Sequence, residues 1–415
     1  MGHTRAATAI ALVLYVTAGM NSHPEEHPAV PPKPERVEVN LVLIDVVVRD
    51  RKDQPVPGLE LDDFELSVDG RVVPSDQLVS LEELCPAASP PAPTAQAAAA
   101  IPDQTLSPAP SAPAAHIVLY FDFTQISFPG RQLSLTTARK FVLGRVGPWP
   151  PVMIVDFTGG VPLVVQPFTT DPQLLAKRLD ELIADRGTVD HDVVDELDKF
   201  YQVAETPMPI RIDVARGFAE EELQRARRSL AALREGLTLL EGLRGRKAVV
   251  LFTDSLRIEP GVQYLAQADM TPLLEGIHIN NEVIALTRTA NEMGVSFYDV
   301  HAGGLQDGTG DVMGPLVAFM RTGIDSAIGL QVSLAIETGG YALHNNNDPG
   351  RIIGSAERDL SCYYILGYRN EAPESGARHK IVVKVRPRGK EKPRRGLVVR
   401  HRPYFIDKPQ RPPTS

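Results

Sequence analysis

The sequence predicts a doubly wound α/β domain with a mainly parallel sheet, flanked along the chain by shorter β segments at both ends. Two apolar runs support this prediction: residues 117–121 and 249–253 are rich in β-branched and aromatic residues, and one aspartate follows each. Runs of this kind that are separated by helical sequence are typical of parallel strands buried on both faces. With 415 residues and 43% hydrophobic content, the chain is long enough for more than one domain.

The chain begins with a stretch that is typical of an export signal, predicted here as residues 1–18. His3 and Arg5 precede an apolar run, and residues 16–18 form an acceptable small-residue cleavage site. The run is too short to span a membrane comfortably. An uncleaved anchor and an ordinary N-terminal helix are the alternatives. We therefore expect export to the periplasm or the cell exterior, no transmembrane segment in the mature chain, and a disordered leader at residues 19–35.

Residues 36–84 are predicted to form a small antiparallel β module. Apolar residues dominate or alternate in residues 37–49 and 64–68. Asp69 and Gly70 follow the second stretch, and this dipeptide suits a tight hairpin turn because both residues tolerate positive φ.

Residues 85–114 are predicted to be a linker. They are almost entirely Pro, Ala, Ser, Thr and Gln, which offer too little apolar side-chain area to offset the entropy of ordering. Cys85 at the start of this stretch and Cys362 are the two cysteines of the chain. A Cys85–Cys362 disulfide is expected if the compartment is oxidising, and two free buried cysteines are the alternative.

Strands and helices alternate through residues 115–358, the predicted α/β domain. Residues 152–157 and 161–165 form two strands joined by Gly159 and Gly160, so we expect antiparallel neighbours at one edge of the sheet. Asp171 and Pro172 are typical of a helix start, with a capping side chain and a proline in the first turn. Further helices are predicted at residues 280–293 and 328–337, each ending at a glycine, with strands at residues 295–300 and 341–343.

The longest helix signal covers residues 219–243. Leucines and one alanine recur there at alternating spacings of three and four, which places them on one helix face. Pairing with a partner helix is one reading of such a pattern. We expect packing on the sheet instead, because Gly245 ends the helix and the strand that leads to Asp254 begins at once.

Residues 359–405 are predicted to contain three strands, at residues 362–368, 380–385 and 397–400, followed by a disordered tail at residues 406–415. Between residues 378 and 402 there are 11 bases and one acid, whereas residues 35–84 hold 13 acids and 5 bases. These opposite charges lead us to expect one β-sandwich-like domain built from both ends of the chain. The alternatives are a basic face that binds an anionic polymer and a solvated edge strand.

Two carboxylates are placed at one edge of the predicted sheet. Asp122 and Asp254 each end a buried parallel strand. Ligands of open α/β sheets bind at the carboxyl ends of the strands. The two side chains are therefore expected to meet over one crevice and to hold a cation or a polar partner.

The order of these features resembles that of a von Willebrand factor type A domain. The resemblance lies in the strand that ends at Asp122, the leucine-rich helix and the VVLFTD run at residues 249–254. Residues 57–66 with Asp69 and Gly70, and the late segments 337–340 and 363–368, resemble the exported bacterial subfamily of VWFA-related acidobacterial proteins. The resemblance covers nearly the whole mature chain.

The resemblance implies a divalent-cation site, with Mg²⁺ as the cofactor. Metal-binding members use a D-x-S-x-S loop, a threonine from a later loop and an aspartate after the central strand. The matching residues are Asp122, Thr124, Ser127, Thr188 and Asp254. Ile126 stands where the second serine is expected, so Ser127, one position late, serves only if the loop bulges. In the alternative reading, Asp122 and Asp254 cap helices or accept hydrogen bonds from loop amides.

Composition and motifs point away from several functions. A net charge of −9 and a pI near 5.6 argue against general nucleic-acid binding, which requires a basic footprint. There is no G-x-S-x-G, Walker loop or Cys-x-x-Cys pair, so no catalytic or cofactor-binding residues are assigned. We expect a non-enzymatic adhesion or scaffold protein that binds a protein partner. The alternatives are a secreted or periplasmic enzyme that uses Asp122 with Asp254 or His301, and a purely structural envelope protein.

Overall fold

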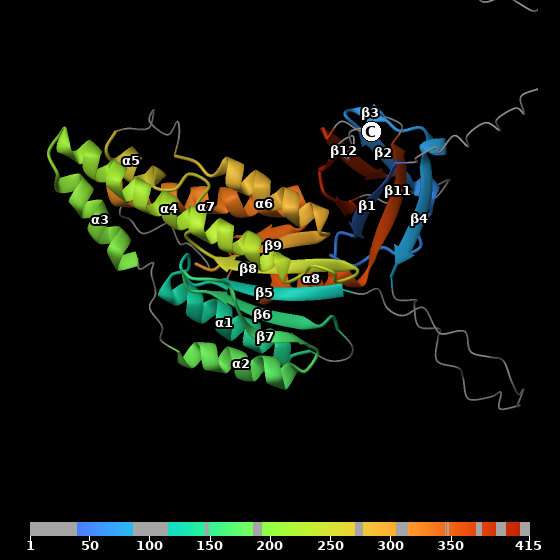
Figure 1. Cartoon of the computed structure of the whole chain (residues 1–415), viewed down its shortest axis with the longest axis horizontal. Helices are drawn as coiled ribbons and strands as arrows, with labels where there is room; N and C mark the ends of the chain where they lie inside the picture. Colours follow the sequence, from blue (N-terminus) through green and yellow to red (C-terminus); the bar gives the residue numbers. More distant parts are fainter. Residues whose placement is uncertain are drawn as a thin grey trace, which may run out of the picture. The chain divides into compact units, whose positions relative to one another are not determined.

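The computed structural model describes residues 40–85, 115–145, 149–185, 193–269, 277–303, 314–344, 346, 348–370, 376–386 and 396–406. Residues from Asn40 onward belong to one compact unit. Its described strands form one six-stranded sheet and two four-stranded sheets (Figure 1). The predicted signal, the leader, most of the linker and nearly all of the tail lie outside the described residues.

The six-stranded sheet has the order β10-β9-β8-β5-β6-β7. Its strands are β5 (Ala115–Asp122), β6 (Val152–Phe157), β7 (Leu163–Thr169), β8 (Arg246–Thr253), β9 (Val295–His301) and β10 (Tyr341–Leu343). All neighbouring pairs are parallel except β6 and β7, which are antiparallel at the edge. The predicted fold class, a doubly wound and mainly parallel sheet, is confirmed.

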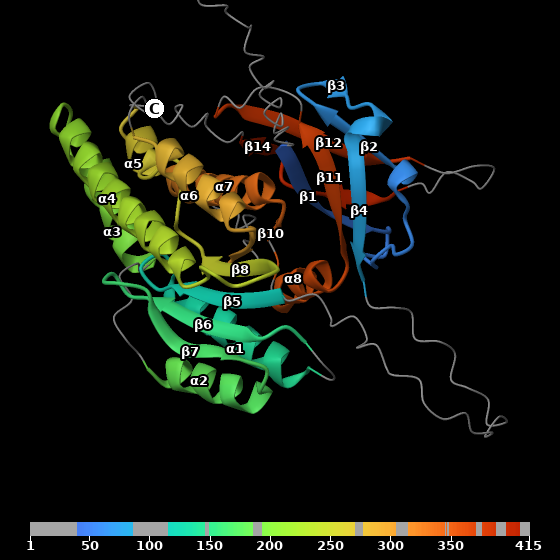
Figure 2. The same ribbon diagram turned by 45° about the vertical axis from the view of Figure 1, so that its right-hand side comes forward.

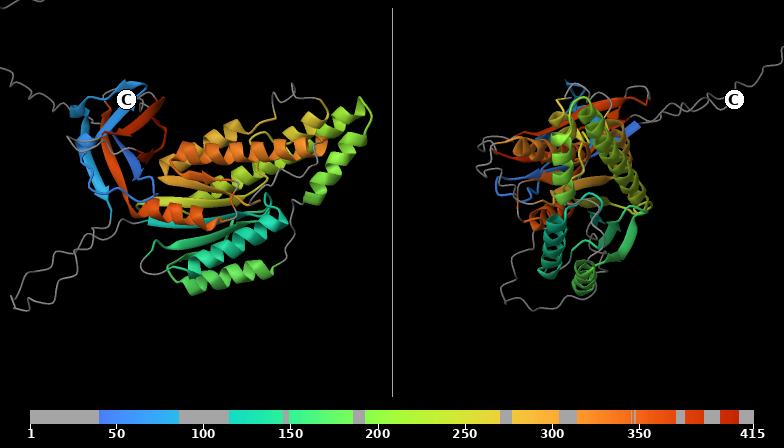
Figure 3. Two further views of the ribbon diagram at one scale, coloured as in Figure 1. Left: turned by 180° about the vertical axis from the view of Figure 1, so that it is seen from behind. Right: turned by 90° about the vertical axis from the view of Figure 1, so that its left-hand side faces the viewer.

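Helices cover both faces of this sheet (Figures 1 and 3). One face carries α1 (Phe128–Leu143), α2 (Pro172–Ala184) and α8 (Gly350–Ser361), and the other carries α4 (Ile210–Thr238), α6 (Asn280–Glu292) and α7 (Pro315–Thr338). Two further helices, α3 (Val193–Glu205) and α5 (Val262–Gln267), pack against the first turns of α4 in a separate apolar cluster. No helix among the described residues combines the length and apolarity needed to cross a membrane.

The leucine stripe of α4 lies on the sheet, as predicted. Leu223, Leu230 and Leu237 are buried against Val249 and Leu251 of β8. The helix begins at Ile210, earlier than the leucine pattern indicates. Its first turns contact α3 and α5 instead of the sheet.

Both ends of the chain build one antiparallel β sandwich (Figure 2). One sheet contains β1 (Asn40–Arg49), β4 (Leu78–Leu84), β11 (Tyr363–Asn370) and β13 (Val398–Arg400). The other contains β2 (Phe64–Val68), β3 (Arg71–Val72), β12 (Arg378–Val385) and β14 (Tyr404–Ile406), with short 3-10 turns at Leu61–Asp63 and Ser75–Gln77 in the connections. Apolar side chains from both sheets share one core, which confirms the expected composite domain.

Opposite charges meet across the strands of this sandwich. Lys384 of β12 stands opposite Glu65 of β2, and Arg386 forms an ion pair with Glu65. The Nδ1 atom of His379 lies 2.8 Å from Asp69 Oδ2 in the turn after β2. Glu65 and Asp69 of the N-terminal module thus have partners in the C-terminal segment, which favours the composite domain over a free basic face. Arg378 of β12 instead pairs with Glu337 of α7.

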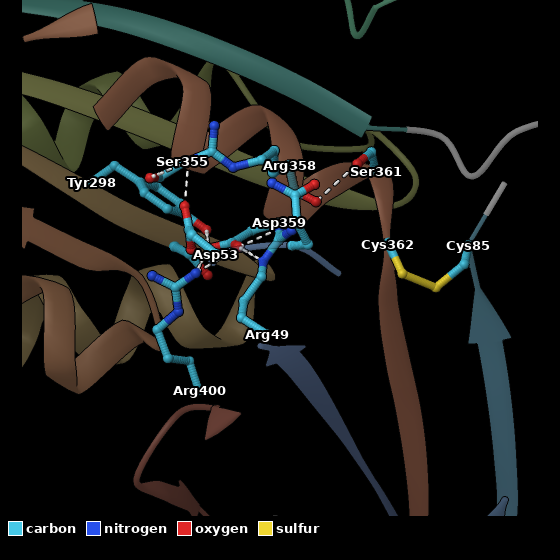
Figure 4. A network of polar contacts seen from close by, with 12 residues as sticks. Arg49, Asp53, Cys85, Tyr298, Ser355, Arg358, Asp359, Ser361, Cys362 and Arg400 are labelled. Carbon is cyan, nitrogen blue, oxygen red and sulfur yellow. Dashed lines mark hydrogen bonds and ion pairs between the residues drawn. A yellow bond between two sulfur atoms is a disulfide. The ribbon is translucent and has the colours of Figure 1, made fainter. Parts of the chain in front are cut away.

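A buried polar network joins the sandwich to α8 (Figure 4). Asp359 of α8 is fully buried and accepts hydrogen bonds from Arg49 Nε and Nη2 at 3.0 and 2.6 Å. Arg400 Nη2 donates to the same carboxylate at 2.6 Å, and the Tyr298 hydroxyl donates to it at 2.8 Å. The predicted Cys85–Cys362 disulfide forms beside this network.

Candidate functional site

The two aspartates singled out from the sequence lie at the same edge of the sheet. Asp122 is the last residue of β5, and Asp254 directly follows β8. These strands are parallel neighbours, with Phe121 opposite Phe252. The strand order also reverses between β5 and β8, since the chain winds outward in one direction from β5 and in the other from β8. Such a switch point is where open α/β sheets bind their ligands.

Asp122 is held by hydroxyl and amide donors. Its side chain is 1% exposed. Oδ1 accepts hydrogen bonds from Thr124 N at 3.1 Å and from Thr124 Oγ1 at 2.6 Å, and Oδ2 accepts one from the hydroxyl of Ser229 on α4. Burial raises the pKa of Asp122 to about 7, although the hydrogen bonds from Thr124 oppose this change.

Asp254 is held by Ser127, the residue that directly precedes α1. The Ser127 amide donates to both carboxylate oxygens at 2.9 and 3.0 Å, and Ser127 Oγ donates to Oδ2 at 2.6 Å. Ser127 also caps α1 by accepting a hydrogen bond from Gly130 N. Gly130 permits this approach, because a Cβ at that position would collide with Asp254 Oδ2. Burial raises the pKa of Asp254 to about 6.

The structure brings four of the five predicted cation ligands to this edge, in two hydrogen-bonded pairs: Asp122 with Thr124, and Asp254 with Ser127. Ile126 is fully buried in the core and supplies no oxygen. Thr188 lies outside the described residues. Within the described ranges no three His, Cys, Asp or Glu side chains converge to hold a metal ion. A cation at this edge would therefore depend on two carboxylates, hydroxyl oxygens and water.

A cavity of about 460 Å³ opens beside Asp122, and we call it the arginine cavity. It is lined by Thr124, by residues 157–159 at the end of β6, and by Glu221, Arg225 and Arg228 of α4. Ser229, which bonds Asp122, directly follows Arg228 in the chain. The cavity and the Asp122 pair are thus built from the same turns of α4 and the same loop after β5.

Sequence reasoning missed Ser229 and the two arginines. Ser229 is 1% exposed and lies within the buried stripe of α4, next to Leu230. The sequence offered one sign of a special role for Ser229: it is a lone serine among the apolar positions of a predicted amphipathic helix. The arginines carried no signal, because charged residues on the outer side of such a helix are usually solvated.

His301, the other residue considered for acid-base chemistry, ends β9 next to Thr253 of β8. Its side chain is 2% exposed, and neither ring nitrogen has a hydrogen-bond partner within the described part of the chain. Burial lowers the pKa of His301 to about 4. The imidazole is therefore neutral at physiological pH and has little contact with solvent.

Comparison with known proteins adds two structural likenesses. No protein-family model and no curated protein matches the chain. An aerotolerance-related membrane protein from Bacteroides fragilis NCTC 9343, in a form with multiple mutations to serines, is 13% identical, with a TM-score of 0.32 over 59% of this chain and 98% of that chain. The TFIIH p34 N-terminal domain is 11% identical, with a TM-score of 0.22 over 59% and 96%.

The class of the protein follows from its own strand order and helix positions. These define a doubly wound α/β protein with a mainly parallel six-stranded sheet, combined with a β sandwich made from an N-terminal and a C-terminal segment of the chain.

Proposed function

We propose that this protein is an exported, non-enzymatic interaction protein that binds a protein partner at the carboxyl edge of its six-stranded sheet. The observation that carries the proposal is that Asp122 and Asp254, each with its own hydroxyl donor, lie at the carboxyl ends of neighbouring strands where the strand order reverses, and that Thr124 also lines the arginine cavity. A crevice at this point is the general ligand site of open α/β sheets.

Exposed apolar side chains next to this edge support a protein as the partner. Val161 in the turn after β6 and Leu163 at the start of β7 are 67% and 60% exposed. Residue 159 of the same turn lines the arginine cavity. Apolar side chains beside a polar crevice are typical of protein interaction sites.

The proposed divalent cation is Mg²⁺, held by Asp122, Thr124, Ser127 and Asp254 with water in the remaining positions. Carboxylate, hydroxyl and water oxygens are suitable ligands for this hard ion. Ile126 replaces one hydroxyl, so we infer weak binding. Titration calorimetry of wild type and Asp254→Asn with Mg²⁺, Mn²⁺ and Ca²⁺ tests this assignment. We expect a heat of binding for wild type and none for Asp254→Asn. Equal heats for both proteins would contradict the assignment.

Export is supported by the Cys85–Cys362 disulfide, since disulfides persist mainly in oxidising compartments. Fractionation of cells that express the full chain tests this part of the proposal. We expect a shortened chain in the periplasm or the medium. A full-length chain in the cytoplasm would contradict it.

Two matched tryptophan variants test partner binding. Gly160→Trp adds bulk to the turn after β6, where a Cβ meets no atom within 4 Å. Arg244→Trp adds the same bulk just before β8, at the opposite edge of the sheet, where the side chain is also exposed. Affinity capture from envelope extract should recover a partner with wild type and with Arg244→Trp, and lose it with Gly160→Trp. Equal recovery by all three proteins would contradict binding at the carboxyl edge.

A further inference from the structure

We propose that the arginine cavity binds the carboxylate of an acidic side chain on the partner protein, through the guanidinium groups of Arg225 and Arg228. This inference rests on the proposed function and adds the chemistry by which the partner is recognised. It assigns the positive charge of the site to the protein itself, so the contact does not require a bound cation.

The charge of the cavity is the first support. Glu221 is the only acid among its described lining residues, and this carboxylate is shared between Arg225 Nη2 at 3.1 Å and Lys199 Nζ at 2.9 Å. Two arginines and one acid thus line the cavity, which gives its described lining a net positive charge, while Lys199 is also paired with Asp195. An anion that enters it gains attraction without displacing an existing carboxylate.

The state of Arg228 is the second support. Its side chain is exposed, and no ion pair or hydrogen bond holds its guanidinium within the residues that the structure describes. Arg225, by contrast, is 13% exposed and anchored by Glu221. One guanidinium is therefore fixed in the wall of the cavity, and the other has all its donors available. A guanidinium binds a carboxylate through two parallel hydrogen bonds, which makes arginine well suited to this task.

The size of the site favours a single acidic side chain over a polyanion. A cavity of about 460 Å³ is large enough for an acidic side chain together with adjoining atoms of the partner chain, but it is not an extended groove for a polymer. Nucleic acid and anionic polysaccharide require a long basic surface, whereas this chain has a net charge of −9. The exposed Val161 and Leu163 nearby offer a partner chain further contact beyond the carboxylate.

The arginine cavity and Asp122 share structural elements. Arg228 and Ser229 are consecutive residues of α4, and the hydroxyl of Ser229 holds Asp122. Thr124 both lines the cavity and donates to Asp122. Asp122 is thereby tied to hydroxyl groups in and next to the cavity wall, while the two arginines line the cavity itself.

A charge-reversal pair tests the inference. The probe is a fluorescently labelled oligoglutamate peptide, with an oligoglutamine peptide of equal length as the neutral comparison. Arg228→Glu reverses a charge in the cavity without removing any internal contact. Arg234→Glu is the matched control, because Arg234 is also exposed on α4 and does not line the cavity. Circular dichroism and thermal unfolding should be unchanged in both variants.

We expect fluorescence anisotropy to show oligoglutamate binding that weakens with salt, falls about tenfold or more in Arg228→Glu and is unchanged in Arg234→Glu and in EDTA. Equal affinity in both variants would overturn the inference, as would loss of binding in EDTA. Competition by free glutarate as strong as that by the peptide would overturn the assignment to a partner side chain. Tighter binding of a phosphopeptide or of heparin would overturn the assignment to a carboxylate.

Partner capture separates this inference from the proposed function. If Gly160→Trp loses the captured partner and Arg228→Glu keeps it, the carboxyl edge binds the partner but the arginines do not recognise it. If both variants keep the partner, both proposals fail. If Gly160→Trp and Arg228→Glu both lose the partner and Arg234→Glu keeps it, the result supports the proposed function and this inference.

Discussion

Asp299 on β9 is a buried acid without a hydrogen-bond partner. Its side chain is 0% exposed, and neither oxygen meets a donor within the described ranges. Burial raises the pKa of Asp299 well above its usual value of about 4. The folded protein therefore keeps this proton over a pH range in which the unfolded chain releases it. The contribution of Asp299 to stability is complete below the unfolded-state pKa and is lost as the pH rises toward the folded-state pKa.

Asp299→Asn is expected to remove this loss. The variant should exceed wild type in free energy of unfolding by about 1 to 3 kcal/mol at pH 8, and the difference should shrink toward pH 4. Urea unfolding at both pH values measures it. Asp213→Asn is the control, because Asp213 is 79% exposed, and it should leave stability unchanged. A constant difference between Asp299→Asn and wild type at both pH values would contradict the assignment.

At the level of single residues, the sequence predicted both acids of the candidate site and two of their hydroxyl donors, Thr124 and Ser127, but not Ser229. Asp122 and Asp254 are recognisable because each ends an apolar run. Ile126 is buried in the core, and the next residue, Ser127, donates to Asp254. Ser229 comes from a helix more than a hundred residues away in the chain, and sequence periodicity does not specify which helix position meets the loop.

Between elements, the contact centred on Asp359 connects α8, β1, β9 and β13. Asp359→Ala would leave Arg49 buried at 1% exposure without its carboxylate partner. Loss of one member of a buried ion pair costs about 3 to 5 kcal/mol. We expect urea unfolding of Asp359→Ala to show a loss of this size.

The exposed pair Arg139 and Asp180 provides the comparison for Asp359. Its side chains are 40% and 50% exposed, so Asp180→Ala should cost less than about 1 kcal/mol. If Asp359→Ala cost no more than Asp180→Ala, the network would contribute little to the junction.

Most elements of the sheet and its helices were predictable because each has its own periodicity. The exceptions obtain their stability from distant partners. The first turns of α4 and the helix α3 pack on each other and on α5, and β14 has three residues that pair only with β12. The C-terminal end of α7 was predictable because Gly339 has a φ of +72° and ends the helix. The start of α7 at Pro315 was not predictable, because residues 315–327 lack a regular apolar stripe.

At the scale of the molecule, the disulfide closes the sandwich at the end of one strand ladder. Cys85 follows β4 and Cys362 precedes β11, and Leu84 pairs with Tyr363 between these strands. The two cysteines are 277 residues apart in the chain, so the crosslink removes much entropy from the unfolded state.

Replacing both cysteines by serine should therefore lower the free energy of unfolding by about 2 to 5 kcal/mol. Urea unfolding with and without dithiothreitol measures this change. The reductant should destabilise wild type by a similar amount and should not affect the double variant. Equal stability of wild type in both conditions would show that the crosslink does not stabilise the folded chain.

The central claim is that the carboxyl edge of the sheet, between β5 and β8, is where the protein meets its partner. Site-specific photocrosslinking in envelope extract tests it most directly, with a photoreactive phenylalanine analogue at Thr158 in the arginine cavity or at Arg244 on the opposite edge. The account predicts one crosslinked protein from position 158 that is absent from position 244. A product from position 244 alone, or the same product from both positions, would contradict it.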